Sequence, residues 1–541
     1  MRRSCIALQF AVCIFAALSL SAQTPIALPY TMTTVAGSSP MAPVAGTQCP
    51  NLPAGAVSTD AFGDGCLAIN GIFGNDPFSG LAVDPFGNVF LNDDLKGVLH
   101  MINPNSGIMT LAAGGATACA SKLDSSGDGC LAATATPTAP ITGARGIGID
   151  PYGNILLAGY NDHFIHVICR AASPLCGSGP PSAAAPVQIP VGNMGLIAGC
   201  AYSSGSAGVS GVGLDNTPAF TTPTAFYAGS PFVNPGASSS ACTTSLGEVD
   251  QPRGATADLF GNVYYADTTS ERWRVVLGPQ TFNGIANPLW AVLEANPAWY
   301  NGTTLLLHAA YVYTVAGLST TATTKGAPCA GGGTATDSFG DGCLFTAATV
   351  FASTSDAQGT AVDAAGNMLF TDAGHGLLRV LFISGSGTAG AAMSNAIEVN
   401  NPGVTPQPGF VYALAGAGTT GGVSATPALG NTRTALDSST TKLTVSPQGN
   451  IFIGDKTRVL FFDITTGYIR ILFTSASANV ASGAFCSGSS GPVSLNSYSD
   501  GCPAPNAEFG NPNGLSVGVD GMGNLYRMTA PAALRRSWCA R

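Results

Sequence analysis

The amino-acid sequence predicts an all-β fold built from repeated four-stranded antiparallel sheets. A five-residue pattern, with Asp or Ser first, Gly fourth and Asn fifth, occurs six times, always between two short apolar runs. These runs alternate with period two, which is the spacing of strands. Charged residues make up only 9% of the chain and Gly is abundant, a composition typical of many short strands and turns.

Each copy of the pattern predicts a tight turn between two strands. Type I turns favour Asp or Ser at the first position, and Gly adopts the left-handed conformation that such hairpins need. The turns start at Asp84, Asp150, Asp258, Asp363, Ser446 and Asp520, and their glycines are Gly87, Gly153, Gly261, Gly366, Gly449 and Gly523. An alternative is that the Asp and Asn residues bind calcium. We favour the structural interpretation, because turn chemistry alone explains every position.

The turns lie at a fixed place in units of four predicted strands. The units span residues 80–114, 146–199, 254–317, 359–416, 442–474 and 514–541, and the last one lacks its fourth strand. Residues 31–37, TMTTVAG, resemble the fourth strands of other units and precede the first unit. We therefore predict a six-bladed β-propeller over residues 30–541, a single domain in which the N-terminal strand completes the last blade and closes the ring.

The repeated unit resembles the NHL repeat of exported bacterial propeller proteins. Segments such as GATADLFGNVYYAD (254–267) and GTAVDAAGNMLFTD (359–372) carry the resemblance, and GDG sequences lie between the units. The match covers nearly the whole chain after its N-terminal segment. Two units depart from the pattern, with Ser446 in place of Asp in the fifth and Thr529 in place of an acidic residue in the sixth.

The N-terminus indicates export. Arg2 and Arg3 precede an apolar run from Ile6 to Leu20, so residues 1–22 are predicted to be a signal peptide cleaved after Ala22. No later run is long enough for a membrane anchor, and we expect a secreted or periplasmic protein. The net charge of −9 argues against a nucleic-acid partner.

The cysteines support an oxidising compartment, because they group into local pairs. Cys539 is left over, and either a buried thiol or an intermolecular link would account for it. The expected pairs are Cys49–Cys66, Cys119–Cys130, Cys169–Cys176, Cys200–Cys242, Cys329–Cys343 and Cys486–Cys502.

Candidate ligand-binding residues lie in the connections from second to third strands, which share one face of the predicted ring. Propellers commonly bind ligands at this mouth of the central channel. The arginines of the third strands, Arg274, Arg379 and Arg458, are expected to pair with carboxylates of the blades. The candidates are Asp94, Asp162, His163, Asp267, Asp372, His375 and Asp455.

An aromatic insertion over residues 279–310 contains Trp290 and a short predicted helix around Leu289–Ala295. It either contacts a partner or covers the edge of the third blade. The covering role is the interpretation that we favour.

These residues do not form a recognisable catalytic set, and no nucleophile, redox or metalloprotease motif is present in the sequence. We therefore expect a non-enzymatic scaffold that binds a protein, peptide or glycan at the channel mouth and needs no cofactor. The alternative is a divalent-metal enzyme with lactonase- or lyase-like activity, in which rim carboxylates hold the cation. Gluconolactonase-like propellers use Glu, Asn and Asp around a divalent metal, and Asp94, Asp162, Asp267 and Asp372 could imitate that arrangement.

Overall fold

A computed structural model describes most of the predicted repeat. It covers residues 30–37, 44–73, 80–93, 97–114, 128–134, 144–161, 163–177, 188–200, 215–221, 249–268, 270–296, 300–301, 303–317, 324–329, 332–348, 359–416, 436, 440–455, 458–474, 516–529 and 533–539. The predicted signal peptide lies outside these residues.

The protein is an all-β propeller of small antiparallel sheets. The first three sheets each have four main strands: β2 (Leu81–Val83), β3 (Val89–Asp93), β4 (Val98–Ile102) and β5 (Met109–Gly114); β6 (Ala144–Ile149), β7 (Ile155–Gly159), β8 (Phe164–Ile168) and β9 (Met194–Cys200); and β12 (Pro252–Ala257), β13 (Val263–Asp267), β14 (Arg272–Val276) and β19 (Tyr311–Ala316).

The remaining large sheets follow the same order. They are β21 (Thr360–Val362), β22 (Met368–Asp372), β23 (Leu377–Leu381) and β24 (Phe410–Gly416); β25 (Thr440–Val445), β26 (Ile451–Asp455), β27 (Arg458–Asp463) and β28 (Tyr468–Thr474); and β29 (Val517–Val519), β30 (Leu525–Thr529), β31 (Ala533–Cys539) and β1 (Tyr30–Ala36).

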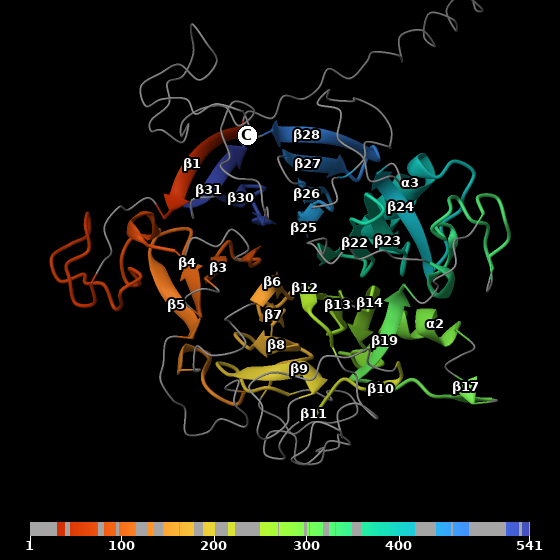
Figure 1. Cartoon of the computed structure of the whole chain (residues 1–541), viewed down its shortest axis with the longest axis horizontal. Coiled ribbons are helices and arrows are strands. Elements are labelled where there is room, and N and C mark those ends of the chain that lie inside the picture. The colour runs from red at the N-terminus through yellow and green to blue at the C-terminus, as the bar shows by residue number, and fades with distance from the viewer. Residues whose placement is uncertain are drawn as a thin grey trace, which may run out of the picture.

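The sheets are arranged around a common centre (Figure 1), and the labelled first strands β6, β12 and β25 lie on the inner side of their sheets. Neighbouring inner strands contact one another: β2 contacts β6 and β29, β12 contacts β6 and β21, and β25 contacts β21 and β29. Glycine permits this approach. A Cβ atom on Gly146 would lie 2.3 Å from the backbone nitrogen of Gly254 in the next sheet. Any side chain there would force the two inner strands apart.

The N-terminal strand β1 pairs with the C-terminal strand β31. The pairing is antiparallel, and it places Tyr30 opposite Cys539 and Thr34 opposite Arg535. The β29–β31 sheet thereby gains a fourth strand from the other end of the chain, as the sequence of residues 31–37 predicts.

Three short strands and two hairpins extend this frame. β20 (Cys343–Leu344) and β10 (Thr217–Pro218) pair antiparallel with outer strands, whereas β11 (Phe220–Thr221) pairs parallel with β9. The hairpins are β15 (Thr281–Phe282) with β16 (Ile285–Ala286), and β17 (Tyr300–Asn301) with β18 (Thr304–Leu305). Single 3₁₀ turns span Ala68–Asn70, Ala132–Thr134 and Phe345–Ala347.

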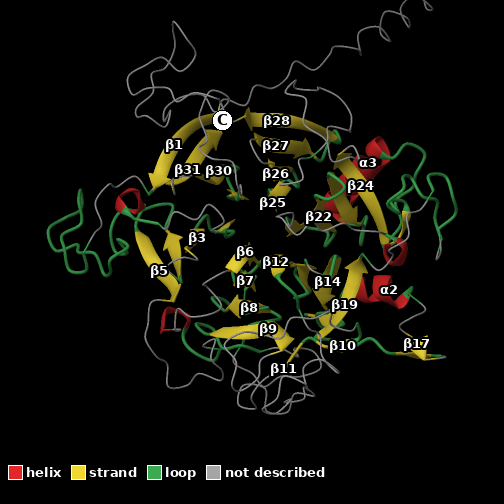
Figure 2. Ribbon diagram, in the orientation of Figure 1, coloured by secondary structure: helices red, strands yellow, loops and turns green. Residues whose placement is uncertain are grey.

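Two helices lie against the outside of the sheets (Figure 2). The predicted helix is α2 (Pro288–Glu294), which starts after the N-cap Asn287 and buries Leu289 and Leu293. Trp290 is also buried, and its indole N–H donates to the carbonyl of Gly278 at 3.1 Å. Within the described part of the insertion, this ring therefore packs into the protein, as a covering role requires.

The second helix, α3 (Gly387–Asn400), is not predicted from its Gly-, Ala- and Ser-rich sequence. It connects two neighbouring sheets. Asn401, just after it, donates to the carbonyl of Ala413 in β24 at 2.9 Å, while Asn400 donates to the carbonyl of Gly467 in the next sheet at 3.0 Å. Tertiary packing selects a helix that local propensity alone does not indicate.

The six turns share one backbone geometry, in which the N–H of the fourth residue donates to the carbonyl of the first. In the turn at Asp363, Oδ1 accepts the N–H groups of Ala365 and Asn367 at 2.9 and 2.8 Å, and Oδ2 accepts the Asn367 side chain at 2.9 Å. The Asn367 oxygen then accepts N–H groups of Ile383 and Ser384 at 2.7 and 2.8 Å. The turn glycines have φ angles from 73° at Gly261 to 92° at Gly153. Asn154, Asn262 and Asn450 accept backbone N–H groups just after their third strands in the same way, so these four turns also anchor the connection that follows the third strand.

Three predicted disulfides form: Cys49–Cys66, Cys169–Cys176 and Cys329–Cys343. Cys130 is also disulfide-bonded, and its predicted partner Cys119 lies outside the described residues. The pairs Cys200–Cys242 and Cys486–Cys502 likewise involve such residues. Several disulfides in one chain are typical of an extracellular or periplasmic environment.

Within the described ranges, no helix has both the length and the apolar character needed to cross a bilayer.

Candidate functional site

The candidate residues lie where the second strand of each sheet turns into the third. We call the face that carries these connections the top face, and the opposite face, which carries the six turns, the bottom face. Asp94 and Asp162 fall outside the described residues. Asp267, Asp372 and Asp455 each end a second strand, and His163 and His375 lie in the connections that follow.

The three aspartates point into the sheets and pair with arginines of the third strands. Asp267 contacts Arg274 at 3.1 Å, Asp372 contacts Arg379 at 3.0 Å, and Asp455 accepts the Nε–H of Arg458 at 2.6 Å. All three carboxylates are buried. Burial raises the pKa of Asp267 to about 6, against the opposing attraction of Arg274. The arginines therefore neutralise the acidic residues below the surface, as the sequence predicts for these side chains.

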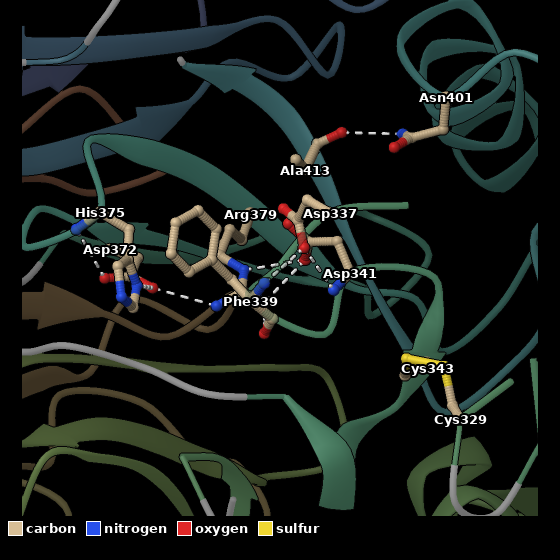
Figure 3. Close-up of polar contacts among 10 residues, drawn as sticks. All are labelled: Cys329, Asp337, Phe339, Asp341, Cys343, Asp372, His375, Arg379, Asn401 and Ala413. Atoms are coloured by element: carbon tan, nitrogen blue, oxygen red, sulfur yellow. Dashed lines mark hydrogen bonds and ion pairs between the residues drawn. A yellow bond between two sulfur atoms is a disulfide. The ribbon is translucent and has the colours of Figure 1, made fainter. Parts of the chain in front are cut away.

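The most extended of these networks surrounds Arg379 (Figure 3). The guanidinium lies between two buried carboxylates, and its NH2 group contacts Asp341 at 2.7 Å while NH1 contacts Asp372. NH2 also donates to the carbonyl of Phe339 at 3.1 Å. The same oxygen atom of Asp372, Oδ2, also accepts the Nδ1–H of His375 at 2.8 Å.

His375 is the part of this network nearest the surface. Its side chain is 18% exposed, and its ring lies against that of Phe339 with centroids 4.0 Å apart. The carboxylate fixes the imidazole orientation, and the phenyl ring supports one of its faces. The site therefore presents a rigid aromatic and imidazole surface, which suits contacts with a flat or apolar part of a ligand.

The acids of the GDGC sequences are a feature that the sequence analysis misses. Asp341 reaches Arg379, and the corresponding residues Asp64 and Asp128 reach buried histidines of the third strands. His100 Nδ1 lies 3.1 Å from Asp64, and His166 Nδ1 lies 3.0 Å from Asp128. His100 and His166 therefore lie inside their sheets, where each pairs with a buried carboxylate.

Asp215 fills the same role without any GDGC sequence. It contacts Arg274 at 3.3 Å and accepts the hydroxyl of Thr314 at 2.8 Å. The sequences of the third strands indicate which units need such a carboxylate. A buried basic side chain at the third position of the strand requires a carboxylate from the preceding loop. β27 has Leu460 at that position, and its unit carries no GDGC sequence.

His163 links two neighbouring sheets at the top face. Its Nδ1 accepts the backbone N–H of Gln251 at 3.1 Å, and Asp250 lies 3.2 Å from the same atom. Burial lowers the pKa of His163, and the charge of Asp250 opposes this shift. His163 thereby fixes the segment that leads into β12.

Among the described residues, no group of three or more His, Cys, Asp or Glu side chains is placed to hold a metal ion. In the described part of the site, buried ion pairs lie below aromatic and imidazole groups that can contact a ligand.

Comparisons with known proteins complete this description. No known protein-family model and no characterised protein sequence matches the chain. A putative phosphatase from Bacteroides thetaiotaomicron is similar in structure, with a TM-score of 0.43 and 11% identity over 95% of this chain and 79% of that one. A protein of unknown function from the same organism has a TM-score of 0.39 and 12% identity over 94% and 75% of the two chains. Virginiamycin B lyase from Staphylococcus aureus has a TM-score of 0.31 and 7% identity over 84% and 78%. Likeness at this level assigns no activity.

Proposed function

We propose that this chain is an exported, NHL-type, six-bladed propeller that acts as a non-enzymatic binding scaffold, with its ligand site on the top face near the central channel. The six large sheets, their repeated turns and the pairing of β1 with β31 support the blade number and the closure of the ring. The disulfides support export.

One observation carries the binding role. The acidic residues at the ends of the second strands are held by arginines inside the sheets, while His375 and Phe339 form a supported surface above them. Acids committed to internal ion pairs stabilise the top face and are poorly suited to hold a catalytic cation. The ligand is a protein, peptide or glycan with a flat or apolar element that packs on the two rings.

A binding screen tests this proposal. The mature protein is applied to glycan and peptide arrays, and each hit is titrated against wild-type protein, His375→Gln and Phe86→Ser. Phe86 is 75% exposed on the bottom face and provides the control. We expect His375→Gln to weaken binding about tenfold, because one packed ring is lost, and Phe86→Ser to leave it unchanged.

Metal analysis of the same purified protein tests the alternative of a metal enzyme. One equivalent of a tightly bound divalent metal, together with turnover of a lactone that chelation abolishes, would replace this proposal with the metal-enzyme alternative. Equal effects of the two substitutions would place the ligand elsewhere.

A further inference from the structure

The outer strand of each sheet has one edge that no other main strand covers, and in four sheets a loop of the chain covers it. In the first sheet, the N–H of Gly65 donates to the carbonyl of Met109 in β5 at 2.8 Å, and the N–H of Met109 donates to the carbonyl of Cys66 at 2.9 Å. Met109 lies opposite the fifth residue of the third strand. The residues at the same register position in β9, β19 and β24 also accept a covering N–H group: Met194 from Gly129 at 2.9 Å, Val312 from Asn216 at 2.8 Å, and Val411 from Gly342 at 2.7 Å.

The outer strand of the fifth sheet, β28, lacks such a cover. Its residue at this register position is Ile469, which lies opposite Phe462, the fifth residue of β27. Within the described ranges, β28 pairs with β27 alone, and the backbone of Ile469 makes no hydrogen bond to a covering loop. β28 lies at the periphery of the ring (Figure 1), so this edge faces away from the central channel.

The sequence accounts for this difference between the sheets. The connection that leads into the fifth sheet has 23 residues (417–439), whereas the one that leads into the fourth has 43 (317–359). The longer connection contains the loop that Cys329–Cys343 closes and that pairs with β24 through β20. The shorter one contains neither a cysteine nor a GDGC sequence. The fifth unit therefore lacks the disulfide-closed loop that covers β24 in the fourth.

β28 also lacks the features that commonly protect an exposed edge, which are short length, Pro and projecting charges. It has seven residues, with neither Pro nor Gly among them. Its single charged residue is Arg470, and the guanidinium carbon lies 4.6 Å from the ring centroid of Phe461 in β27, so the charge lies back over the sheet. Tyr468 is 47% exposed and Leu472 is half-buried. The edge is thus long and accessible to an extended segment.

The neighbouring third strand indicates which side chain such a segment should carry. In the fourth sheet, the covering loop places Asp341 at 2.7 Å from Arg379, the buried third residue of β23. The corresponding residue of β27 is Leu460, which lies in the apolar core. A carboxylate brought to this place would meet an apolar side chain in place of a cation, which is unfavourable. The segment that suits β28 is therefore uncharged at this position.

We propose that β28 is a docking edge for an extended segment of a partner protein, which adds a strand to this sheet and carries a neutral residue where the loop on β24 carries Asp341. The backbone of Ile469 supplies one donor and one acceptor to the segment, as Met109 does in β5. This edge is distinct from the top-face site and gives the protein a second place of contact.

A synthetic peptide of residues 340–347 provides the probe, because this stretch covers β24 in the folded chain. The test peptide carries Asp341→Leu and Cys343→Ser. One control peptide keeps Asp341, and a second adds Gly342→Pro, which removes the N–H group that donates to Val411 in the fourth sheet. Fluorescence anisotropy measures the affinity of each labelled peptide for the mature protein, and hydrogen exchange locates the bound peptide.

We expect the test peptide to bind and each control peptide to bind about tenfold or more weakly, because a control loses a hydrogen bond or buries a carboxylate. The bound peptide should slow the exchange of backbone N–H groups in residues 468–474 and leave residues 410–416 unchanged. Before any peptide is added, residues 468–474 should exchange about tenfold or more faster than residues 410–416, because their edge is uncovered.

Leu460→Arg tests the requirement for a neutral residue from the side of the protein, because it copies Arg379. This variant should prefer the peptide that keeps Asp341, whereas Leu460→Met, which is close to Leu in volume, should keep the wild-type preference. Urea unfolding midpoints identify a variant that has lost its fold, and in that case the comparison of peptides on wild-type protein decides.

Any of three results would overturn the docking edge. If residues 468–474 are as protected as residues 410–416 in dilute protein, the chain covers its own strand. If their protection increases with protein concentration, a second copy of the chain occupies the edge. If the test peptide gives residues 468–474 no protection, or if all three peptides bind equally, the edge does not take a strand of this chemistry.

Discussion

At the scale of single residues, two kinds of turn begin with an aspartate that accepts the same backbone N–H groups, and they differ in the fifth residue. In the DxxGN turns, Asp363 accepts the N–H groups of the third and fifth residues, Ala365 and Asn367. In the loop before β21, Asp337 accepts those of Phe339 and Asp341 in the same way. An Asn at the fifth position reaches backbone groups, whereas an Asp reaches a buried cation.

Arg379→Met tests the importance of that buried cation. The substitution leaves Asp341 and Asp372 buried without their partner, and we expect the free energy of unfolding to fall by roughly 3–5 kcal/mol. Arg470→Met, at a partly exposed arginine, should cost less than about 1 kcal/mol. Urea denaturation measures both values, and similar losses in the two variants would contradict the account.

Lys442 predicts a distinct pH dependence of stability. Its pKa is about 8 in the folded protein, compared with the ordinary value of 10.5. Between these values the folded protein has released a proton that the unfolded chain still binds. The cost of burying the charged ammonium is therefore lost, and the free energy of unfolding increases as the pH rises. The stability difference between wild-type protein and Lys442→Ser should therefore increase from pH 8 to 10.5. Urea denaturation across this pH range measures both proteins, and a constant difference would contradict the role of Lys442.

At the scale of elements, the loops closed by disulfides connect neighbouring sheets. The loop closed by Cys329–Cys343 pairs with β24 through β20 and carries Asp337, Phe339 and Asp341 to the top face. Its disulfide therefore supports the candidate site as well as overall stability.

Replacing Cys329 and Cys343 together by Ser should lower the free energy of unfolding by about 3 kcal/mol, from the entropy of a loop of this length. Because Phe339 supports His375, any ligand found in the screen should also bind more weakly. Thermal denaturation and titration measure the two effects. A loss of stability with full affinity would show that the ion pairs alone hold this loop in place.

The repeat is enough to predict the strands, the turns and the pairing of β1 with β31, because period-two alternation and turn chemistry are local signals. The internal partners Asp341 and Asp215 are not accessible to that reasoning, since they come from loops distant in sequence. The same limit applies to α3, whose helix depends on contacts with β24 and the following sheet.

At the scale of the whole molecule, the sheet formed by β29–β31 depends on the far end of the chain. Without β1, strand β31 becomes an exposed edge able to pair with another molecule. We expect deletion of the chain up to residue 37 to give a destabilised protein that self-associates, seen by light scattering and denaturation. A monomer with an unchanged unfolding midpoint would show that β1 is dispensable.

The register of β1 and β31 has one more consequence. Because Tyr30 lies opposite Cys539, the start of the first strand and the end of the last are adjacent in space. A short linker would join them without crossing the sheet, and new termini would then fit in an exposed connection between two other sheets. The chain could therefore start between any two sheets, and a circularly permuted gene should encode a protein with the same fold.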